Sequence, residues 1–241
     1  MKIACLGGGP AGLYFAISLK IRAPHHDITV FERNEEGVTF GWGVVFSDQT
    51  MDYLRQNDPQ SAQAILDEFA HWDDIDVHFK GQITTSTGHG FCGIGRHRLL
   101  DILASRAAEL GVDIRYNQAV DVNELTLKDY DLIIASDGIN SATRAHFEDQ
   151  FDVDIEKRAN KFMWLGTHKV FDAFKFIFKE TPQGWIWAHA YQFDENTSTF
   201  IPECSEETYQ NFGFAEMSQA DIIAKIENIF ADELDGHSLM S

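Results

Sequence analysis

The feature that most constrains the fold is a run of glycines near the N-terminus. Residues 7–12 read Gly-Gly-Gly-Pro-Ala-Gly, the pattern G-x-G-x-x-G. Residues 3–6 before it form a short apolar run, as in a buried parallel strand, and residues 11–21 after it carry apolar side chains at helical spacing. A second short apolar run, 28–31, completes a βαβ unit. The chain is therefore expected to begin with a doubly wound parallel sheet.

Each glycine in this pattern has its own task in holding a dinucleotide. Gly7 permits the tight turn after the strand, Gly9 lets a pyrophosphate approach the backbone, and Gly12 lets the helix pack against the sheet. Pro10 and Ala11 begin the helix, whose N-terminal N–H groups face the negative phosphates. We therefore expect a dinucleotide at this turn. The alternative is a glycine turn of purely structural use.

An acidic side chain stands at the end of the second strand. Glu32 lies twenty residues beyond Gly12, where a carboxylate accepts hydrogen bonds from the ribose hydroxyls of an adenosine and repels a 2′-phosphate. Arg33 follows it. Both residues are expected at the cofactor, and NADP is not expected at this site. The motif by itself does not separate FAD from NAD.

A second nucleotide signal follows a buried strand expected over residues 131–135. Residues 137–144 read DGINSATR, and the Asp137-Gly138 turn would expose backbone N–H groups beside the nucleotide. Arg144 would supply a cation for a phosphate. Taken alone, an Asp-Gly pair is more typical of a plain turn.

A third signal is an arginine at the start of a helix expected over residues 96–110, with Gly111 just past its end. Arg96 opens this helix in an R-x-x-L pattern, a position suited to a second phosphate contact. Taken alone, such an arginine is more typical of a solvated helix end.

Together, in this order, the three motifs resemble those of the single-component FAD-dependent aromatic hydroxylases, the class that includes p-hydroxybenzoate hydroxylase. Three longer segments, residues 41–50, 161–174 and 198–209, resemble the salicylyl-CoA 5-hydroxylase and anthraniloyl-CoA monooxygenase group. They are also similar to the tryptophan hydroxylase of violacein biosynthesis. The resemblance covers essentially the whole chain, and it implies FAD rather than NAD at the three motifs.

The resemblance also implies a reaction. NAD(P)H reduces the flavin, and one oxygen atom of O2 then enters an electron-rich ring, while the protein supplies placement, electrostatics and exclusion of water. Because the flavin carries this chemistry, no side chain is assigned as catalytic. No metal is expected either, because His71, His78, His89 and His97 show no ligand spacing tied to a helix.

The sequence changes character after residue 144, where aromatic and β-branched segments are typical of a mixed or antiparallel sheet. Five side chains in this part alternate along the chain and so share one face of a strand: Trp185, Trp187, His189, Tyr191 and Phe193. In the family that the chain resembles, the second domain's sheet covers the substrate. His189, Tyr191 and Trp187 are therefore candidate substrate-pocket residues, and the alternative is a packed sheet core with one satisfied histidine.

Residues 37–47 are interpreted as a glycine-punctuated connection. Within it, Gly43 of the Gly41-Trp42-Gly43 sequence is expected to let the chain pass close to the flavin ring. The alternative is a structural loop turn.

The expected fold class is α/β: a Rossmann-like FAD-binding domain with a doubly wound parallel sheet, and a substrate domain with a mixed or antiparallel β-sheet. Residues 1–72 and 90–150 are assigned to the first domain, and residues 73–89 and 151–241 to the second. The family's later Gly-Asp motif, which holds the ribityl chain of FAD, is not found. The chain is thus expected to be the N-terminal part of such an enzyme, without the C-terminal part of its FAD domain and with weakened FAD affinity.

Charge and cysteine usage restrict the partners. With 19 Lys+Arg against 38 Asp+Glu, the formal net charge of −19 lacks the basic footprint of a nucleic-acid binder and would be repelled by anionic membranes. The three cysteines show neither zinc spacing nor a disulfide framework, which fits a reducing compartment. With no signal-peptide pattern and no stretch of membrane-spanning length, a cytoplasmic location is expected.

These observations predict an FAD-dependent monooxygenase that hydroxylates an aromatic ring, using O2 and either NADH or NADPH. An aryl-CoA ester of the salicylyl-CoA or anthraniloyl-CoA type is the favoured substrate. The negative charge would oppose CoA unless a cluster such as Arg96, Arg98 and Arg106 offset it. The alternatives are a hydroxylase of free tryptophan or indole, a truncated non-catalytic nucleotide-binding protein, and a plain NAD-dependent dehydrogenase, which would leave DGINSATR unexplained.

Overall fold

The computed structural model describes residues 1–120, 122 and 128–241, and it divides the chain into two compact units. Both units are built from segments that are far apart in the sequence. Unit 1 comprises Met1–Thr39, Asp52–Asp67 and His97–Glu156. Unit 2 comprises Phe40–Met51, Glu68–Arg96 and Lys157–Ser241.

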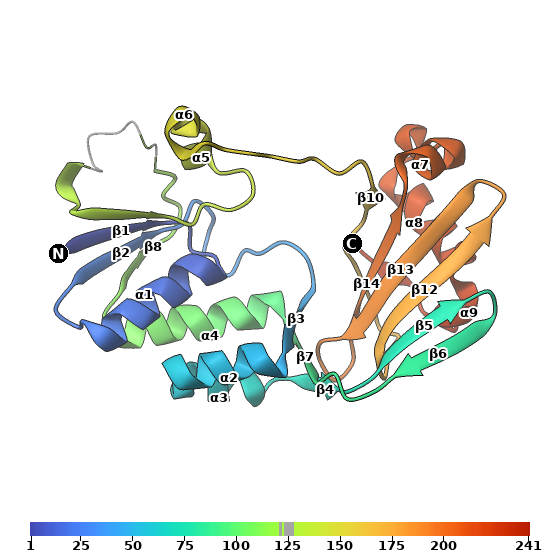
Figure 1. Ribbon diagram of the computed structural model, residues 1–241, viewed down its shortest axis with the longest axis horizontal. Helices are drawn as coiled ribbons and strands as arrows, with labels where there is room; N and C mark the ends of the chain where they lie inside the picture. Colours follow the sequence, from blue (N-terminus) through green and yellow to red (C-terminus); the bar gives the residue numbers. More distant parts are fainter. Residues whose placement is uncertain (121, 123–127) are drawn as a thin grey trace. The chain divides into compact units, whose positions relative to one another are not determined.

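Unit 1 is built on a parallel sheet with the strand order β8-β2-β1-β9 (Figure 1). The strands are β1 (Lys2–Leu6), β2 (Asp27–Phe31), β8 (Asp113–Arg115) and β9 (Leu132–Ala135). Leu6 pairs with Phe31 on one side and with Ala135 on the other, so the carboxyl ends of three strands meet at one edge. The interior of β1 is inaccessible to solvent, as its short apolar sequence predicts. The expected parallel sheet is confirmed.

Helices cover this sheet. Those of unit 1 are α1 (Pro10–Arg22), α3 (Pro59–Leu66), α4 (Arg96–Glu109, whose first residue belongs to unit 2), α5 (Ala142–His146) and α6 (Glu148–Phe151). Helix α2 (Asp48–Asn57) begins in unit 2 and ends in unit 1. An ion pair ties the start of α3 to α4: Arg106 donates from Nε and Nη2 to the two carboxylate oxygens of Asp58, at 3.0 and 3.1 Å.

Unit 2 contains two sheets. The larger has the order β15-β11-β14-β13-β12-β5-β6, with β10 also paired to β14, and only its β5–β12 pair is parallel. Its strands are β5 (Ile75–Phe79), β6 (Gln82–Ser86), β10 (Lys161–Phe162), β11 (Leu165–Thr167), β12 (Phe174–Thr181), β13 (Gly184–Gln192), β14 (Ser198–Cys204) and β15 (Leu239–Met240). The smaller sheet has the order β3-β7-β4, with strands β3 (Gly43–Ser47), β4 (Ala70–Trp72) and β7 (Phe91–Gly95). The expected mixed sheet is confirmed.

One face of the larger sheet packs against helices. These are α7 (Glu206–Phe212), a 3₁₀ helix (Phe214–Glu216), α8 (Gln219–Ile229) and α9 (Ala231–Leu234). Two buried side chains come from the helical side: Ile226 of α8 and Phe230, the residue that follows α8. They belong to one cluster with three buried residues of the sheet, namely Phe200 of β14 and Ile186 and Ala188 of β13. The inward residues of β13 are therefore the small and aliphatic ones, which leaves its aromatic side chains on the other face.

Residues 37–47 differ from the interpretation as a simple connection, because β3 begins at Gly43 and pairs with β7. This pairing also places residues 40–51 and 68–96 in unit 2. The division expected from the sequence differs, because it assigned three of these stretches to the nucleotide-binding domain: residues 40–51, 68–72 and 90–96. Hydrogen bonds explain the difference: the Gly43 N–H donates to Thr199 Oγ1 at 2.9 Å, and the Tyr191 hydroxyl donates to the Gly43 carbonyl at 2.8 Å.

Among the described residues, no helix combines the length and the apolar character needed to cross a membrane.

Candidate functional site

The glycine turn of unit 1 is shaped by close contact with the end of β9. Gly7 has a φ of +105°, and a Cβ on it would lie 2.4 Å from the Ser136 carbonyl oxygen. A Cβ on Gly12 would lie 2.1 Å from the Gly7 oxygen. Gly9 is different, because, apart from its chain neighbours, no described residue has an atom within 4 Å of the place where its Cβ would be. Gly7 and Gly12 are thus required by packing, whereas Gly9 leaves open space above the start of α1, at Pro10.

Glu32 is fixed beside this turn. Its Oε2 accepts a hydrogen bond from the Gly8 N–H at 2.8 Å, while its Oε1 accepts two from the backbone and side chain of Asn34, both at 2.8 Å. A carboxylate oxygen has two lone pairs, so Oε2 keeps one for a further donor such as a ribose hydroxyl. Gly8 is a residue that the motif treats as variable, but a Cβ there would lie 2.9 Å from the Glu32 Cβ. The signal for this requirement in the sequence was a glycine at the variable second position of the motif.

The DGINSATR segment forms a loop organised by its own aspartate. Asp137 Oδ1 accepts from the Ser141 hydroxyl at 2.6 Å, and Oδ2 accepts from the Thr143 N–H and hydroxyl at 3.1 Å. Burial raises the pKa of Asp137, but these hydrogen bonds outweigh it and hold the pKa below its usual value. Ser136 also donates to the Leu6 carbonyl at 2.9 Å, which joins the loop to β1. Sequence reasoning missed Ser136, Ser141 and Thr143 as the residues that build this loop.

Gly138 and Arg144 have distinct surroundings in the same loop. Gly138 adopts a φ of +84°, and open space lies where its Cβ would be. The Arg144 guanidinium donates to the Ile139 carbonyl at 2.6 Å, so it closes the loop in this structure. Arg33 lies exposed after β2.

The expected cofactor residues therefore fall into two sets. Unit 1 brings together the glycine turn, Glu32 and Asp137 at the carboxyl ends of β1, β2 and β9, the edge where parallel α/β sheets bind ligands. Arg96 and Gly43 belong to unit 2, where the Arg96 N–H donates to the Trp42 carbonyl at 2.8 Å. The unit 1 set offers helix N-terminal N–H groups for phosphate and a carboxylate for ribose.

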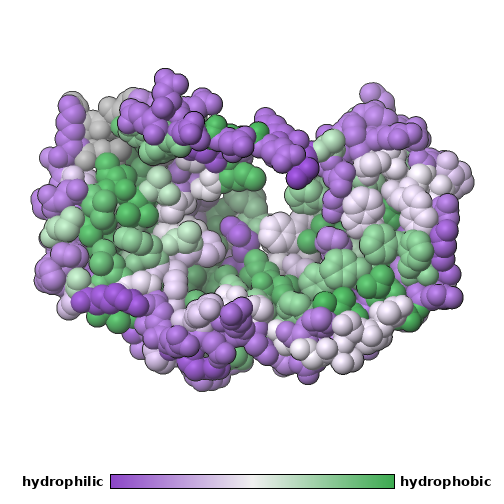
Figure 2. Space-filling model, viewed as in Figure 1, coloured by the Kyte–Doolittle hydropathy of each residue, from purple (hydrophilic) through white to green (hydrophobic). Residues whose placement is uncertain are grey.

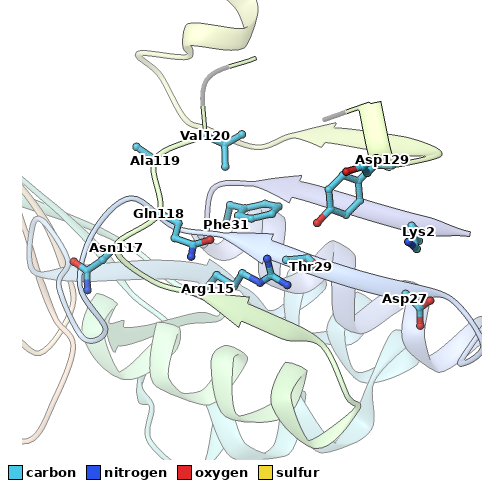
Figure 3. A pocket seen from close by; sticks show the side chains of 11 residues that line it. Lys2, Asp27, Thr29, Phe31, Arg115, Asn117, Gln118, Ala119, Val120 and Asp129 are labelled. Carbon is cyan, nitrogen blue, oxygen red and sulfur yellow. The ribbon is translucent and has the colours of Figure 1, made fainter. Parts of the chain in front are cut away.

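A cavity of about 650 Å³ in unit 1 lies elsewhere. Its side chains rise from β2, from β8 and from the segment after β8, including Thr29, Phe31 and Arg115, on the side of the sheet away from the helices (Figure 3). Lys2 and Asp27, at the amino ends of their strands, also line it. Phe31 and Arg115 are the last residues of β2 and β8, so the cavity extends along this face to the carboxyl ends, but none of residues 7–12 of the glycine turn lines it.

The aromatic residues of β13 share one face, as their alternation predicts, and β12 adds rings beside them. Phe174 stacks on Tyr191 with ring centroids 5.2 Å apart, and Phe176 meets His189 edge-on at 4.9 Å. Trp187 lies beside Phe178, with ring centroids 6.3 Å apart and an angle of 29° between the ring planes. In Figure 2, the surface over β12 and β13 is green to white, the colours of apolar and near-neutral residues.

The three candidate substrate-pocket residues differ in what their polar atoms do. Burial lowers the pKa of His189, although the Glu203 carboxylate opposes this, so the surroundings favour the neutral imidazole. Trp187 Nε1 donates to Glu203 at 3.3 Å. Burial raises the pKa of Tyr191, whose protonated hydroxyl donates to Gly43 in the unit interior. Tyr191 thus has a structural partner, and His189 is the half-buried polar group of this face.

Replacing Tyr191 by phenylalanine is expected to lower the free energy of unfolding by about 1–3 kcal/mol, because the buried Gly43 carbonyl loses its side-chain donor. Tyr53→Phe, at a residue that is 62% exposed, is the comparison and should lower it by less, because water can replace any partner that an exposed hydroxyl loses. Urea unfolding measures both. Equal effects for the two variants would contradict a structural role of the Tyr191 hydroxyl.

The Gly41-Trp42-Gly43 sequence is explained by packing within unit 2. A Cβ on Gly41 would lie 2.4 Å from the Trp164 ring, and one on Gly43 would lie 2.5 Å from Phe193. Trp42 in turn lies over Gly166, where a Cβ would come within 2.5 Å of the indole. These contacts require the glycines whether or not a flavin lies nearby.

Comparison with known proteins identifies relatives along the whole chain. The chain is 38% identical over 248 residues to salicyloyl-CoA 5-hydroxylase of a Streptomyces species, covering 100% of the chain and 48% of that protein. It is 35% identical to protodeoxyviolaceinate monooxygenase of Chromobacterium violaceum, covering 100% of the chain and 65% of that protein. A 3-hydroxy-4-methyl-anthranilyl-[aryl-carrier protein] 5-monooxygenase of Streptosporangium sibiricum is 32% identical over 84% of the chain and 57% of its own length.

Solved structures share the fold. The p-nitrophenol 4-monooxygenase of Pseudomonas putida has a TM-score of 0.72 over 99% of the chain and 66% of its own, at 15% identity. A probable FAD-dependent monooxygenase of Pseudomonas aeruginosa has a TM-score of 0.63 over 87% of the chain and 62% of its own, at 13% identity.

No protein-family model matches the chain. The chain spans between about half and two thirds of the length of the curated relatives it matches. Over its whole length it is a homologue of aromatic monooxygenases, and it has the fold of the FAD-dependent hydroxylases.

Proposed function

We propose that the chain provides the adenosine-binding and substrate-facing parts of an FAD-dependent monooxygenase that hydroxylates an aromatic ring. The observation that carries the proposal is the Glu32 carboxylate, held by the Gly8 N–H beside the open space at Gly9. The overall reaction consumes an arene, O2, NAD(P)H and a proton and yields the phenol, water and NAD(P)+.

The residues of unit 1 fit the adenosine half of FAD. The first turn of α1 contains no acidic residue, and its N-cap, Gly9, has no side chain to occupy the free N–H groups, so these can receive a pyrophosphate. Glu32 would hold a ribose hydroxyl, and the Gly138 backbone would lie beside the nucleotide. The bound flavin would supply the oxygen-transfer chemistry, with NADH or NADPH as the reductant.

For the substrate we favour an aryl group linked to CoA, because the relative with 38% identity is named for salicyloyl-CoA. The aromatic face of β12 and β13 suits an aromatic ring, since it offers rings for stacking. On this face the neutral His189 would pair with a ring hydroxyl or amino group, and Trp187 would flank the ring. A substrate without CoA, such as free tryptophan or indole, is the second candidate, because the relative with 35% identity is named for protodeoxyviolaceinate and not for a CoA ester.

The test is a visible spectrum of the purified chain after addition of FAD and removal of the excess. A retained flavin spectrum supports the proposal, and a colourless chain would favour a non-catalytic protein. Consumption of NADH or NADPH is then measured with salicyloyl-CoA, anthraniloyl-CoA and tryptophan in parallel. If only the CoA esters increase NADH or NADPH consumption, the substrate is an aryl-CoA ester. If only tryptophan increases it, the proposed CoA-linked substrate is wrong.

Glu32→Ala is expected to weaken FAD binding about 10- to 100-fold, because a hydrogen bond to a charged group contributes roughly 1.5–3 kcal/mol. The exposed Glu36 lies four residues away, and Glu36→Ala removes the same charge without touching the turn. Fluorescence titration with FAD measures both affinities. Unchanged affinity in Glu32→Ala would remove the ribose role from this residue.

A further inference from the structure

Three side chains of different chemistry converge at the edge of the small sheet in unit 2. The Nε2 atom of His71 lies 3.5 Å from Oδ1 of Asp48, and the Sγ atom of Cys92 lies 3.8 Å from the same oxygen. All three potential ligand atoms lie within 4.8 Å of one another. No part of the proposed hydroxylation uses these residues.

The backbone fixes this arrangement. His71 of β4 and Cys92 of β7 are register partners on adjacent antiparallel strands, so their side chains stand next to each other on one face. On the other side of β7, Phe46 of β3 is paired with Cys92, and Asp48 follows two residues later. The Asp48 N–H donates to the Gly90 carbonyl at 3.0 Å, which holds the start of α2 against the residues before β7. Three chain segments therefore contribute one ligand each, and all three belong to unit 2.

Two of the three ligand–ligand distances match the edges of a metal coordination tetrahedron, and the third, between His71 Nε2 and Cys92 Sγ, lies within 4.8 Å. Zinc binds nitrogen and oxygen at about 2.0–2.2 Å and thiolate sulfur at about 2.3 Å, which gives ligand–ligand edges of about 3.3–3.8 Å. The two distances to Asp48 fall in this range. The side chains of Asp48 and His71 are 60% and 49% exposed, whereas Cys92 is 2% exposed. A metal would thus sit over a buried thiolate with access from solvent.

We propose that Asp48, His71 and Cys92 form a binding site for one divalent zinc-type ion, with the fourth coordination position left to water. Thiolate and imidazole ligands select Zn²⁺, Co²⁺ and similar ions over Mg²⁺ and Ca²⁺, which prefer oxygen ligands only. On binding, the Cys92 S–H bond breaks, a sulfur–metal bond forms and the proton passes to solvent. The ligands are not close in the sequence, so the spacing argument that led to the expectation of no metal could not detect them.

Cobalt(II) is the probe, because thiolate ligation gives it a charge-transfer band and four-coordination gives intense visible bands. The 241-residue chain is reduced, freed of metal with a chelator and titrated with Co²⁺. We expect saturation at one equivalent, both sets of bands, and their loss when Zn²⁺ is added, but not when excess Mg²⁺ is added. No charge-transfer band in the wild-type chain would overturn the proposal.

Matched variants assign the ligands. Cys92→Ser should remove the charge-transfer band and weaken Zn²⁺ binding at least about tenfold, whereas Cys204→Ala, at another buried cysteine of unit 2, should leave both unchanged. His71→Ala, at an exposed position where folding should be retained, should also weaken Zn²⁺ binding, and Zn²⁺ should raise the melting temperature of the wild type but not of this variant. A band that survives Cys92→Ser, or full Zn²⁺ stabilisation of His71→Ala, would overturn the proposal. These readouts need no FAD, so their failure is independent of the proposed hydroxylase function.

Discussion

Gly12→Ala is expected to abolish FAD binding and to destabilise unit 1 by about 3 kcal/mol. The added methyl group would lie 2.1 Å from the Gly7 oxygen and 2.6 Å from the Ser136 hydroxyl, so both the glycine turn and the end of β9 would have to move. The glycine turn carries the expected phosphate contacts, and the end of β9 leads into Asp137 and Gly138, which are expected beside the nucleotide. Thermal unfolding and flavin retention after desalting measure the two effects.

Gly9→Ala is the matched control, because its added Cβ would lie more than 4 Å from every described residue other than its chain neighbours. Its melting temperature should remain that of the wild type. Its FAD affinity should nevertheless fall more than about tenfold, because the methyl group would occupy the space assigned to the pyrophosphate. A Gly9→Ala protein that binds FAD normally would contradict this position for the cofactor, and a stable Gly12→Ala protein would contradict the packing of the turn.

Arg106→Ala should have the largest effect on stability outside the glycine turn, lowering the free energy of unfolding by about 3–5 kcal/mol. The Asp58 side chain is 2% exposed, and Arg106 meets both of its carboxylate oxygens. Removing the guanidinium would leave a buried carboxylate without its cation. Arg55→Ala is the control, because it breaks the exposed ion pair with Asp52 and should lower the free energy of unfolding by less than about 1 kcal/mol. Similar losses in the two variants would contradict a large contribution from the buried pair of Arg106 and Asp58.

The same pair predicts a pH dependence. Burial raises the pKa of Asp58, but the hydrogen bonds from Arg106 and Ser61 outweigh it, so the folded-state pKa lies below the ordinary value. The stabilisation is therefore fully present above the unfolded pKa of about 4 and is lost as the pH falls through the folded pKa. Urea unfolding from pH 7 to pH 3 should show the wild type approaching Arg106→Ala. If the difference in the free energy of unfolding between the wild type and Arg106→Ala stayed constant over this pH range, the lowered pKa of Asp58 would be contradicted.

The engagement of Arg106 with Asp58 also changes the expectation for CoA. An arginine cluster of Arg96, Arg98 and Arg106 was one way to offset the negative charge of the chain. Arg106 is held by Asp58 and by Glu109, and Arg96 belongs to the other unit. The charge of Arg106 is thus already paired within unit 1, and a CoA ester would need other cations in its place.

Much of the architecture follows from local patterns in the sequence. The first strand, the glycine turn and the first helix are contiguous, so residues 2–22 contain the steric reasons for their own fold. The alternation along β13 likewise assigns its aromatic residues to one face without reference to the rest of the chain. Glu32 could be placed at the glycine turn because the βαβ unit has a nearly fixed length.

Contacts between distant segments could not be derived in this way. Nothing local to Gly43 shows that β3 pairs with β7 or that Tyr191 and Thr199 bind its backbone, 148 and 156 residues away. The convergence of Asp48, His71 and Cys92 likewise depends on strand register.

The sequence by itself thus determined the parallel sheet, its glycine turn and the alternating aromatic strand, because each depends on the backbone preferences and side-chain periodicity of neighbouring residues. Only the tertiary structure decided that residues 40–51 belong to unit 2, that the Tyr191 hydroxyl serves the fold, and that a carboxylate, an imidazole and a thiol meet at one sheet edge. The physical reason is that strand register and side-chain packing between remote segments are set by the burial and hydrogen bonding of the whole unit.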